Sequence, residues 1–237
     1  TKILRDYITD QELYEKIVDR YESKKSNEDL FIMSISMQNH GGYTEKYDNF
    51  DEKARMLGIN YPDVNQYLSL IHESDSALEY LISYFEKVDD PVEIVFFGDH
   101  QPSLSSSFYP YLNGKGLGGL TLSELENLYT VPFFIWTNYD SGKESVELTS
   151  LNYLSTLALE RAGIALPAYN QFLADMMEEI PAVNSRGFYS KSQGKFLHVE
   201  DAAGEDAKWL KNYEILQYNN MFDKRNKSEL IFPYLKQ

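Results

Sequence analysis

The residues best suited to chemistry are an adjacent aspartate and histidine at the end of an apolar run. Asp99 and His100 follow Gly98, where the apolar run 92–97 stops. A carboxylate and an imidazole are good ligands for zinc, manganese and similar divalent ions. A glycine before them would let the backbone turn so that both side chains reach a common point. The structural alternative is an aspartate that caps the next turn, with a histidine packed beside it.

A second candidate is His40, which follows another apolar run, 30–37, and precedes two glycines. A histidine between a strand end and flexible glycines could meet an anionic ligand as a hydrogen-bond donor or proton carrier. The alternative is a loop histidine that is hydrogen-bonded to backbone carbonyls. His72, in a helical pattern, and His198, in an expected hairpin, are assigned no role.

Hydrophobic periodicity predicts the elements that must position these side chains. The continuous apolar runs 30–37, 92–97 and 131–136 are typical of strands buried on both faces of a parallel sheet. Helices are expected from apolar spacing and from capping pairs such as Thr9 with Glu12. The expected helices cover residues 9–21, 62–87, 121–129, 150–162, 168–179 and 206–221, and a hairpin is expected at 188–199.

Strands that alternate with helices predict an α/β fold, here a sandwich with a mostly parallel sheet flanked by helices. The C-terminal hairpin and helix are expected to attach to this sheet, and residues 1–237 are expected to form a single domain. Ligands of open parallel sheets bind beyond the carboxyl ends of the strands. We therefore expect His40 to lie close to Asp99 and His100.

Composition excludes several classes of function. The chain has 37 acidic and 22 basic residues, a net charge of -15, which argues against a nucleic-acid partner. The absence of cysteine excludes disulfides, zinc-thiolate sites and a cysteine nucleophile. The glycine-rich stretch 114–119 lacks the spacing of a phosphate-binding loop. The serines at 105–107 lack the context of a hydrolase nucleophile.

Several segments, in order and spacing, closely resemble the lipoteichoic acid synthase-like sulfatases of the alkaline phosphatase superfamily. The segments are 37–43 (MQNHGGY), 97–102 (FGDHQP), 131–136 (VPFFIW), 152–154 (NYL) and 216–223 (LQYNNMFD). The resemblance implies an alkaline-phosphatase-like fold for nearly the whole chain. It also implies an extracytoplasmic catalytic domain that membrane helices anchor in the cell envelope of a Gram-positive bacterium.

The resemblance further implies a metal-dependent sulfatase, or a transferase that moves phosphoglycerol from a lipid, using a divalent metal such as Mn²⁺. Asp99 and His100 match the family's paired metal ligands, and His40 matches a histidine that contacts the phosphoryl or sulfuryl group of the substrate. The metal would neutralise charge on the transferred group, and His40 would donate to one of its oxygens.

The family's threonine nucleophile and a further acidic ligand have no counterpart in this sequence, because Thr9 and Thr44 stand in a different context. We therefore expect the chain to be the C-terminal part of a longer catalytic domain and to be inactive alone. Its expected partners are the upstream half of the polypeptide, a lipid-linked phosphoglycerol or another anionic ester, and a second copy across an exposed sheet edge. The alternative is a degenerate binding module that retains the fold without catalysis.

Overall fold

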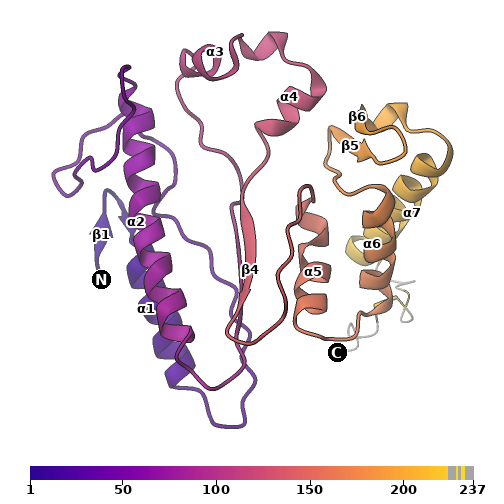
Figure 1. Ribbon diagram of the computed structural model, residues 1–237, viewed down its shortest axis with the longest axis horizontal. Helices are drawn as coiled ribbons and strands as arrows, with labels where there is room; N and C mark the ends of the chain where they lie inside the picture. Colours follow the sequence, from indigo (N-terminus) through magenta and orange to yellow (C-terminus); the bar gives the residue numbers. More distant parts are fainter. Residues whose placement is uncertain (224–227, 229–230, 233–237) are drawn as a thin grey trace. The chain divides into compact units, whose positions relative to one another are not determined.

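The structure is a computed structural model of the 237-residue chain, and it describes every residue except 224–227, 229–230 and 233–237 (Figure 1). The chain forms two compact units. Unit 1 consists of residues 1–92 and 99–119, and unit 2 consists of residues 93–98 and 120–237. No helix in the described ranges is both long and apolar enough to cross a bilayer.

Unit 1 is built on two long helices that lie side by side (Figure 1). The helices are α1 (Asp10–Glu22) and α2 (Pro62–Phe85), and they follow the expected positions closely. The ring of Tyr21 on α1 packs edge-on against the ring of Phe85 on α2, with 5.2 Å between centroids. Aromatic pairs in this geometry add to the free energy gained from burial.

The local signals at the starts of these helices are confirmed. The hydroxyl of Thr9 accepts a hydrogen bond from the backbone N–H of Glu12, which satisfies one of the free donors at the start of α1. Pro62 occupies the first turn of α2, where a missing N–H leaves no intrahelical bond unmade. A short hairpin of β1 (Ile3–Leu4) and β2 (Tyr7–Ile8) precedes α1.

The prediction of a buried strand at 30–37 is wrong. This segment has no regular secondary structure, and much of its apolar surface is exposed: the exposed fraction of Phe31 is 90%. Its apolar character made it resemble a core strand, but a strand also needs a neighbour with which to share backbone hydrogen bonds. No strand of the described residues pairs with it.

The long connection after His100 contains more regular structure than its sequence suggested. It includes α3 (Phe108–Asn113) and the 3-10 turn η1 (Leu117–Gly119). The ring of Phe108 is buried and packs edge-on against Tyr61, with 5.2 Å between centroids. This aromatic contact ties the connection to the start of α2.

Unit 2 contains the other two expected strands, but they do not pair as predicted. β3 (Glu93–Phe97) and β4 (Phe133–Thr137) are antiparallel, with Phe97 opposite Phe133 and Glu93 opposite Thr137. The expectation of a mostly parallel sheet is therefore corrected: the described residues contain three separate two-stranded sheets. The chain is a mixed α/β fold with small sheets. The error arose because apolar runs show that a strand is buried and carry no information on its direction.

The rest of unit 2 is a helical layer around a hairpin, close to the expected positions. Its remaining elements are α4 (Leu122–Asn127), η2 (Leu151–Tyr153), α5 (Leu154–Arg161), α6 (Ala168–Glu179), β5 (Gly187–Ser190), β6 (Lys195–His198), η3 (Val199–Asp201) and α7 (Gly204–Met221). β5 and β6 pair antiparallel, as predicted. Thr121 and Glu124 form the expected capping box at the start of α4.

The core of unit 2 lies where η2, α6, β5 and α7 meet. Its buried members are Tyr153, Leu173, Met176, Ile180, Phe188 and Tyr213. The hydroxyl of Tyr153 donates to the carbonyl of Ile180, so the one polar group on this fully buried ring is satisfied.

We predict that Leu173→Ala destabilises unit 2 by about 2–5 kcal/mol, because it removes buried methyl groups and leaves a cavity. The exposed fraction of Leu173 is 1%, whereas that of Leu151 in the same unit is 56%. The matched control Leu151→Ala should change the free energy of unfolding by no more than about 0.5 kcal/mol. Urea unfolding followed by circular dichroism measures both, and equal effects of the two variants would show that this core is misassigned.

Candidate functional site

Asp99 and His100 lie in unit 1, directly after the end of β3, and both side chains are exposed. The backbone N–H of His100 donates to Oδ1 of Asp99 at 2.8 Å. Oδ2 of Asp99 lies 3.6 Å from Nε2 of His100. The first carboxylate oxygen therefore caps the turn, as the structural alternative proposed, while the second faces the imidazole, as the metal hypothesis requires.

The hydrogen bond at the other ring nitrogen of His100 suits metal binding. Nδ1 lies 2.9 Å from the carbonyl oxygen of Gln101. A carbonyl oxygen only accepts, so the proton of a neutral ring is on Nδ1, and Nε2 keeps its lone pair. Metal-binding histidines commonly donate their second N–H to a backbone carbonyl in this way.

The spacing of the two ligand atoms also fits one ion. Two ligands about 2.0–2.2 Å from a tetrahedral or octahedral ion lie roughly 3–3.5 Å from each other. The 3.6 Å between Oδ2 of Asp99 and Nε2 of His100 is close to this range. The residues described contain no group of three or more histidine, aspartate or glutamate side chains that could hold a metal. A metal held by this pair would therefore need further ligands beyond Asp99 and His100.

Gly98 has a role different from the one that the sequence suggested. Its φ is not among the positive values in the structure, so a left-handed turn is not the reason for glycine here. A Cβ at position 98 would lie 3.0 Å from Cβ of Val131, and the N–H of Gly98 donates to the carbonyl of Pro132. Glycine is thus required for the close approach of the segment that leaves β3 to the segment that enters β4.

His40 is exposed and lies in the irregular loop 38–42 of unit 1. Its Nδ1 lies 3.0 Å from the hydroxyl of Tyr7 on β2, and the two rings lie 5.5 Å apart at an angle of 55°. The carbonyl of His40 accepts a hydrogen bond from Arg5, at 2.7 Å. The backbone and the ring of His40 are therefore both held by the N-terminal hairpin. Among the described residues, no hydrogen-bond partner is found for Nε2.

Arg5 is the residue of this site that the sequence did not reveal. Its exposed fraction is 3%, and its guanidinium donates to the backbone carbonyls of Gln38, His40 and Gly42. One arginine among 22 basic residues has no motif that distinguishes it. The available signal was its place in a two-residue connection between short apolar pairs, which is typical of a hairpin turn.

A buried polar network fixes the other side of the loop. The hydroxyl of Ser74 on α2 donates to Oδ2 of Asp10, and it accepts from Nε2 of Gln38 and Nδ2 of Asn39. The backbone N–H of Asp10 donates to Oε1 of Gln38. Burial raises the pKa of Asp10 above its ordinary value, and hydrogen bonds from Ser74 and Ser36 offset part of this rise.

Tyr43, which follows the His40 loop, is hydrogen-bonded to the backbone of that loop. Its hydroxyl donates to the carbonyl of Asn39 at 2.7 Å. Burial raises the pKa of Tyr43 to about 12, and the negative charges of Tyr67 and Asp99 add to the rise. That His40, Asp99 and His100 share one site, and the role of each of them, remain predictions.

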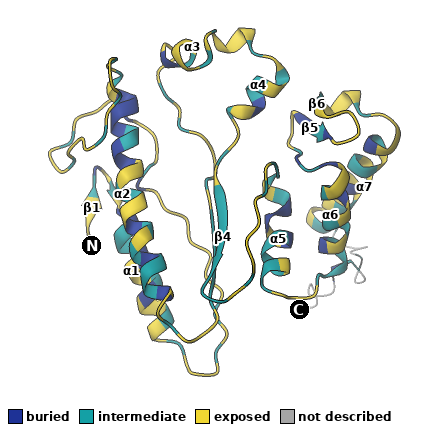
Figure 2. Cartoon of the chain, viewed as in Figure 1, coloured by how far each residue is buried: buried dark blue, intermediate teal, exposed yellow. Residues whose placement is uncertain are grey.

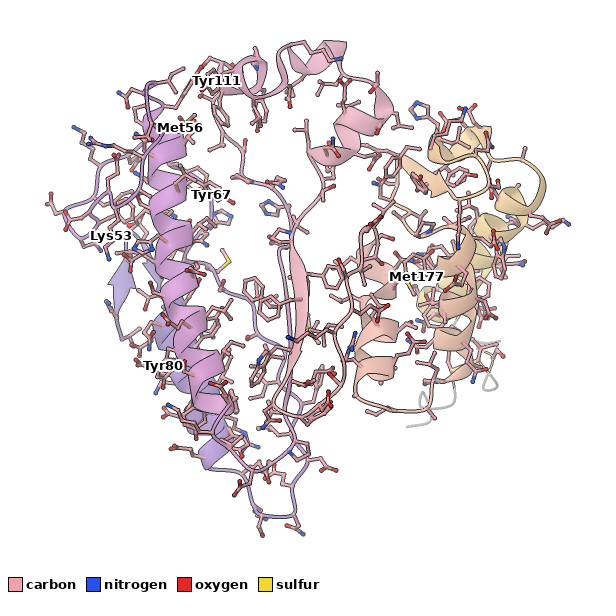
Figure 3. The ribbon with its side chains drawn as sticks, in the orientation of Figure 1. Lys53, Met56, Tyr67, Tyr80, Tyr111 and Met177 are labelled. Atoms are coloured by element: carbon pink, nitrogen blue, oxygen red, sulfur yellow. The ribbon has the colours of Figure 1, made fainter. Side chains whose placement is uncertain are left out.

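Figure 3 shows how α2 supports the loop that continues from this site. Lys53 and Met56 lie along α2, whose earlier and later turns are marked by Tyr67 and Tyr80. The N–H of Lys53 donates to the hydroxyl of Ser69, and that of Met56 donates to Oδ1 of Asn65. Polar side chains from the first turns of α2 thus hold the irregular backbone around residues 53–56. These turns are buried, as the dark blue in Figure 2 shows.

Comparison with known proteins places this mixed α/β chain in a family. A family model described as sulfatase matches residues 2–164, more than half of the chain. The chain therefore belongs to the sulfatase family, as the resemblance of its motifs implied.

The solved structure of Streptococcus pyogenes phosphoglycerol transferase GacH in complex with sn-glycerol-1-phosphate shares the fold. Its TM-score is 0.63 at 19% identity, over 92% of this chain and 51% of that one.

Two curated relatives come from Rhizobium meliloti (strain 1021). One is named for cyclic beta-1,2-glucan modification and is 22% identical over 95% of this chain and 36% of its own length. The other, capsular polysaccharide biosynthesis protein RkpI, is 34% identical over 44% of this chain and 18% of its own length. The chain thus spans about a third or less of the length of these relatives.

We predict that Asp10 makes the stability of the chain depend on pH in an unusual direction. A carboxyl whose pKa is raised by folding stabilises the folded state fully below its unfolded value of 3.8, and this contribution is lost as the pH rises through the folded pKa. The free energy of unfolding of the wild type, relative to that of Asp10→Asn, should therefore fall over this range and then stay constant.

Asp90 supplies the matched control, because hydrogen bonds from Lys24 and Tyr21 lower its pKa. The wild type, relative to Asp90→Asn, should lose stability as the pH falls through the lowered pKa. Urea unfolding at a series of pH values measures both differences. A slope of the same sign for the two variants would show that Asp10 is not buried as described.

Proposed function

We propose that this chain forms part of an extracytoplasmic, metal-dependent enzyme that transfers phosphoglycerol, or cleaves a related phosphate or sulfate ester. The observation that carries the proposal is the geometry of Asp99 and His100, whose Oδ2 and Nε2 lie 3.6 Å apart with the imidazole proton directed to Gln101. Membership of the sulfatase family supports the same class of chemistry.

In this proposal Asp99 and His100 hold one divalent cation, for which Mn²⁺ is our first choice. When bound, the ion supplies positive charge against the oxygens of the transferred group. His40 contacts the substrate through Nε2 and donates a hydrogen bond to a non-bridging or leaving oxygen. The nucleophile and the remaining metal ligands would come from residues outside these 237. The coverage of only 51% of the GacH chain is consistent with such a division.

We further propose that the acceptor is a hydroxyl of a cell-surface glycan. Two observations support this substrate class. The names of both curated relatives refer to a polysaccharide, one by its modification and one by its biosynthesis. The related solved structure is of a phosphoglycerol transferase with sn-glycerol-1-phosphate bound. A phosphoglycerol donor and a glycan acceptor together would give an anionic, phosphoglycerol-substituted polysaccharide. We also propose that segments outside these 237 residues anchor the enzyme in a membrane.

The test uses the complete gene product, with phosphatidylglycerol as donor and a neutral β-glucan as acceptor. ³¹P NMR follows the formation of a phosphodiester on the glycan with and without Mn²⁺. Asp99→Ala and His100→Ala should each lower kcat/KM by more than about 100-fold, because even outer partners of a metal site cost up to this factor. They should also weaken the binding of Mn²⁺.

His40→Ala should lower kcat by about 10²–10⁴-fold, in the range of general acid–base groups, while the affinity for Mn²⁺ stays close to that of the wild type. His72→Ala is the matched control, because His72 is an exposed histidine of unit 1 on α2. It should leave both quantities unchanged. Absence of metal-dependent cleavage and transfer, with the same Mn²⁺ affinity in the wild type and Asp99→Ala, would favour a non-catalytic binding module.

A further inference from the structure

The β1–β2 hairpin places an unusual residue in its turn. Arg5 has a φ of 53°, and it is the only non-glycine residue with positive φ among those described. Residues with a Cβ adopt this region rarely and at an energetic cost, so the surroundings must hold Arg5 there. Nδ2 of Asn49 donates to the carbonyl of Arg5 at 3.0 Å and helps to hold the turn.

The guanidinium of Arg5 is bound to backbone and amide oxygens, and no described carboxylate forms an ion pair with it. Its Nη2 donates to the carbonyl of Gln38 at 2.9 Å and to that of His40 at 2.7 Å. Its Nη1 donates to the carbonyl of Gly42 at 3.4 Å and to Oε1 of Gln66 at 3.3 Å. The fork thus binds alternate carbonyls of the His40 loop and one side chain of α2.

Three tyrosine rings surround this cation. The Cζ atom of Arg5 lies 5.5 Å from the ring centre of Tyr43, 5.6 Å from that of Tyr7 and 5.8 Å from that of Tyr47. The negative face of an aromatic ring attracts a cation at such distances. A buried charge without a counter-ion is expensive, so rings and carbonyl dipoles must replace the lost hydration. Most of the oxygens that replace the hydration of Arg5 are backbone carbonyls of the His40 loop.

The same hairpin holds the imidazole of His40. The hydroxyl of Tyr7 lies 3.0 Å from Nδ1. If the hydroxyl donates, the neutral ring carries its proton on Nε2. If the ring is protonated, Nδ1 donates to the hydroxyl and Nε2 again carries a proton. In both of these arrangements Nε2 of His40 is a donor, as contact with an anionic oxygen requires; in the third, a neutral ring protonated on Nδ1 donates to the hydroxyl and Nε2 carries a lone pair.

We propose that Arg5 and Tyr7 are positioning residues for His40: Arg5 fixes the backbone of residues 38–42, and Tyr7 fixes the ring with its proton on Nε2. The role in turnover rests on the proposed function, whereas the geometry and the tautomer do not. Arginine is required at position 5 because its planar guanidinium binds two carbonyls through Nη2 and two further oxygens through Nη1. A lysine ammonium cannot span them.

The first test is spectroscopic and needs no activity. In the full 237-residue chain labelled with ¹⁵N-histidine, the ¹⁵N shifts and the couplings to Hε1 and Hδ2 identify the protonated nitrogen of His40 at about pH 9, where histidine rings are neutral. We expect the proton on Nε2 alone. Tyr7→Phe should give a mixture of both tautomers. A proton on Nδ1 in the wild type, or an unchanged spectrum in Tyr7→Phe, would overturn the role of Tyr7.

The second test concerns Arg5 and the loop backbone. Arg5→Lys should increase amide hydrogen exchange at residues 38–42 by at least about 10-fold, with unchanged exchange in α6. Arg20→Lys is the matched control, because Arg20 is an exposed residue of α1 that pairs with Glu28. It should leave the loop unchanged. Unchanged exchange in Arg5→Lys would overturn the role of Arg5. If this variant does not fold, Arg5→Gln, which keeps donors without a charge, provides the same comparison.

The third test links the geometry to catalysis in the complete gene product. Arg5→Lys and Tyr7→Phe should lower kcat by about 10-fold or more and leave the affinity for Mn²⁺ unchanged. Wild-type activity in both variants would overturn the positioning role and leave the proposed function intact. If the wild type is inactive but the spectroscopic results hold, the proposed function fails and the arrangement of His40 stands.

Discussion

The constraint on which unit 1 depends is that a long irregular backbone needs hydrogen-bond partners that no helix or sheet of its own provides. Residues 38–56 form neither helix nor strand, so their buried N–H and carbonyl groups cannot bond to a neighbouring strand or within a helix. The protein meets this need with side chains. Ser69 and Asn65 of α2 accept from the N–H groups of the later part of the loop, and Gln66 donates to the carbonyl of Glu45. Arg5 binds the carbonyls of the earlier part.

This solution explains why the first turns of α2 bury polar residues alongside the apolar Val64 and Leu70. Asn65, Gln66 and Ser69 are buried, although their types are usually exposed. Buried polar groups are costly unless they are satisfied, and a satisfied network specifies one arrangement more strictly than apolar contacts do. A loop held in this way has a definite shape, so His40 can be presented from irregular backbone without the mobility that exposed loops usually have. Rigid support is what a group needs if it is to meet a developing charge.

The sequence predicted the elements of this fold better than their pairing. Thr9, Pro62 and the Thr121–Glu124 pair act locally, through hydrogen bonds and sterics within a few residues, so their helices were found near the observed positions. Strand direction and partners depend on contacts distant in sequence. The apolar runs at β3 and β4 therefore predicted strands but not their antiparallel pairing, and the run 30–37 predicted a strand that is absent. The same limit hid Arg5, whose partners lie 33 or more residues away.

The two parts of the candidate site are supported in different ways, and this difference bears on how the site would work. His40 is fixed through Arg5 and Tyr7 before any ligand binds. Asp99 and His100 are exposed, and the hydrogen bonds that orient them within the described residues come from their own turn and from Gln101. Two ligands give modest metal affinity, and the free energy of metal binding can be coupled to the arrival of the other ligands. In the proposed site, His40 is thus preorganised toward the substrate, while Asp99 and His100 would gain their order when the coordination shell is completed. Such a site would bind its metal firmly only where the rest of the catalytic domain is in place, which limits ester chemistry to the assembled enzyme.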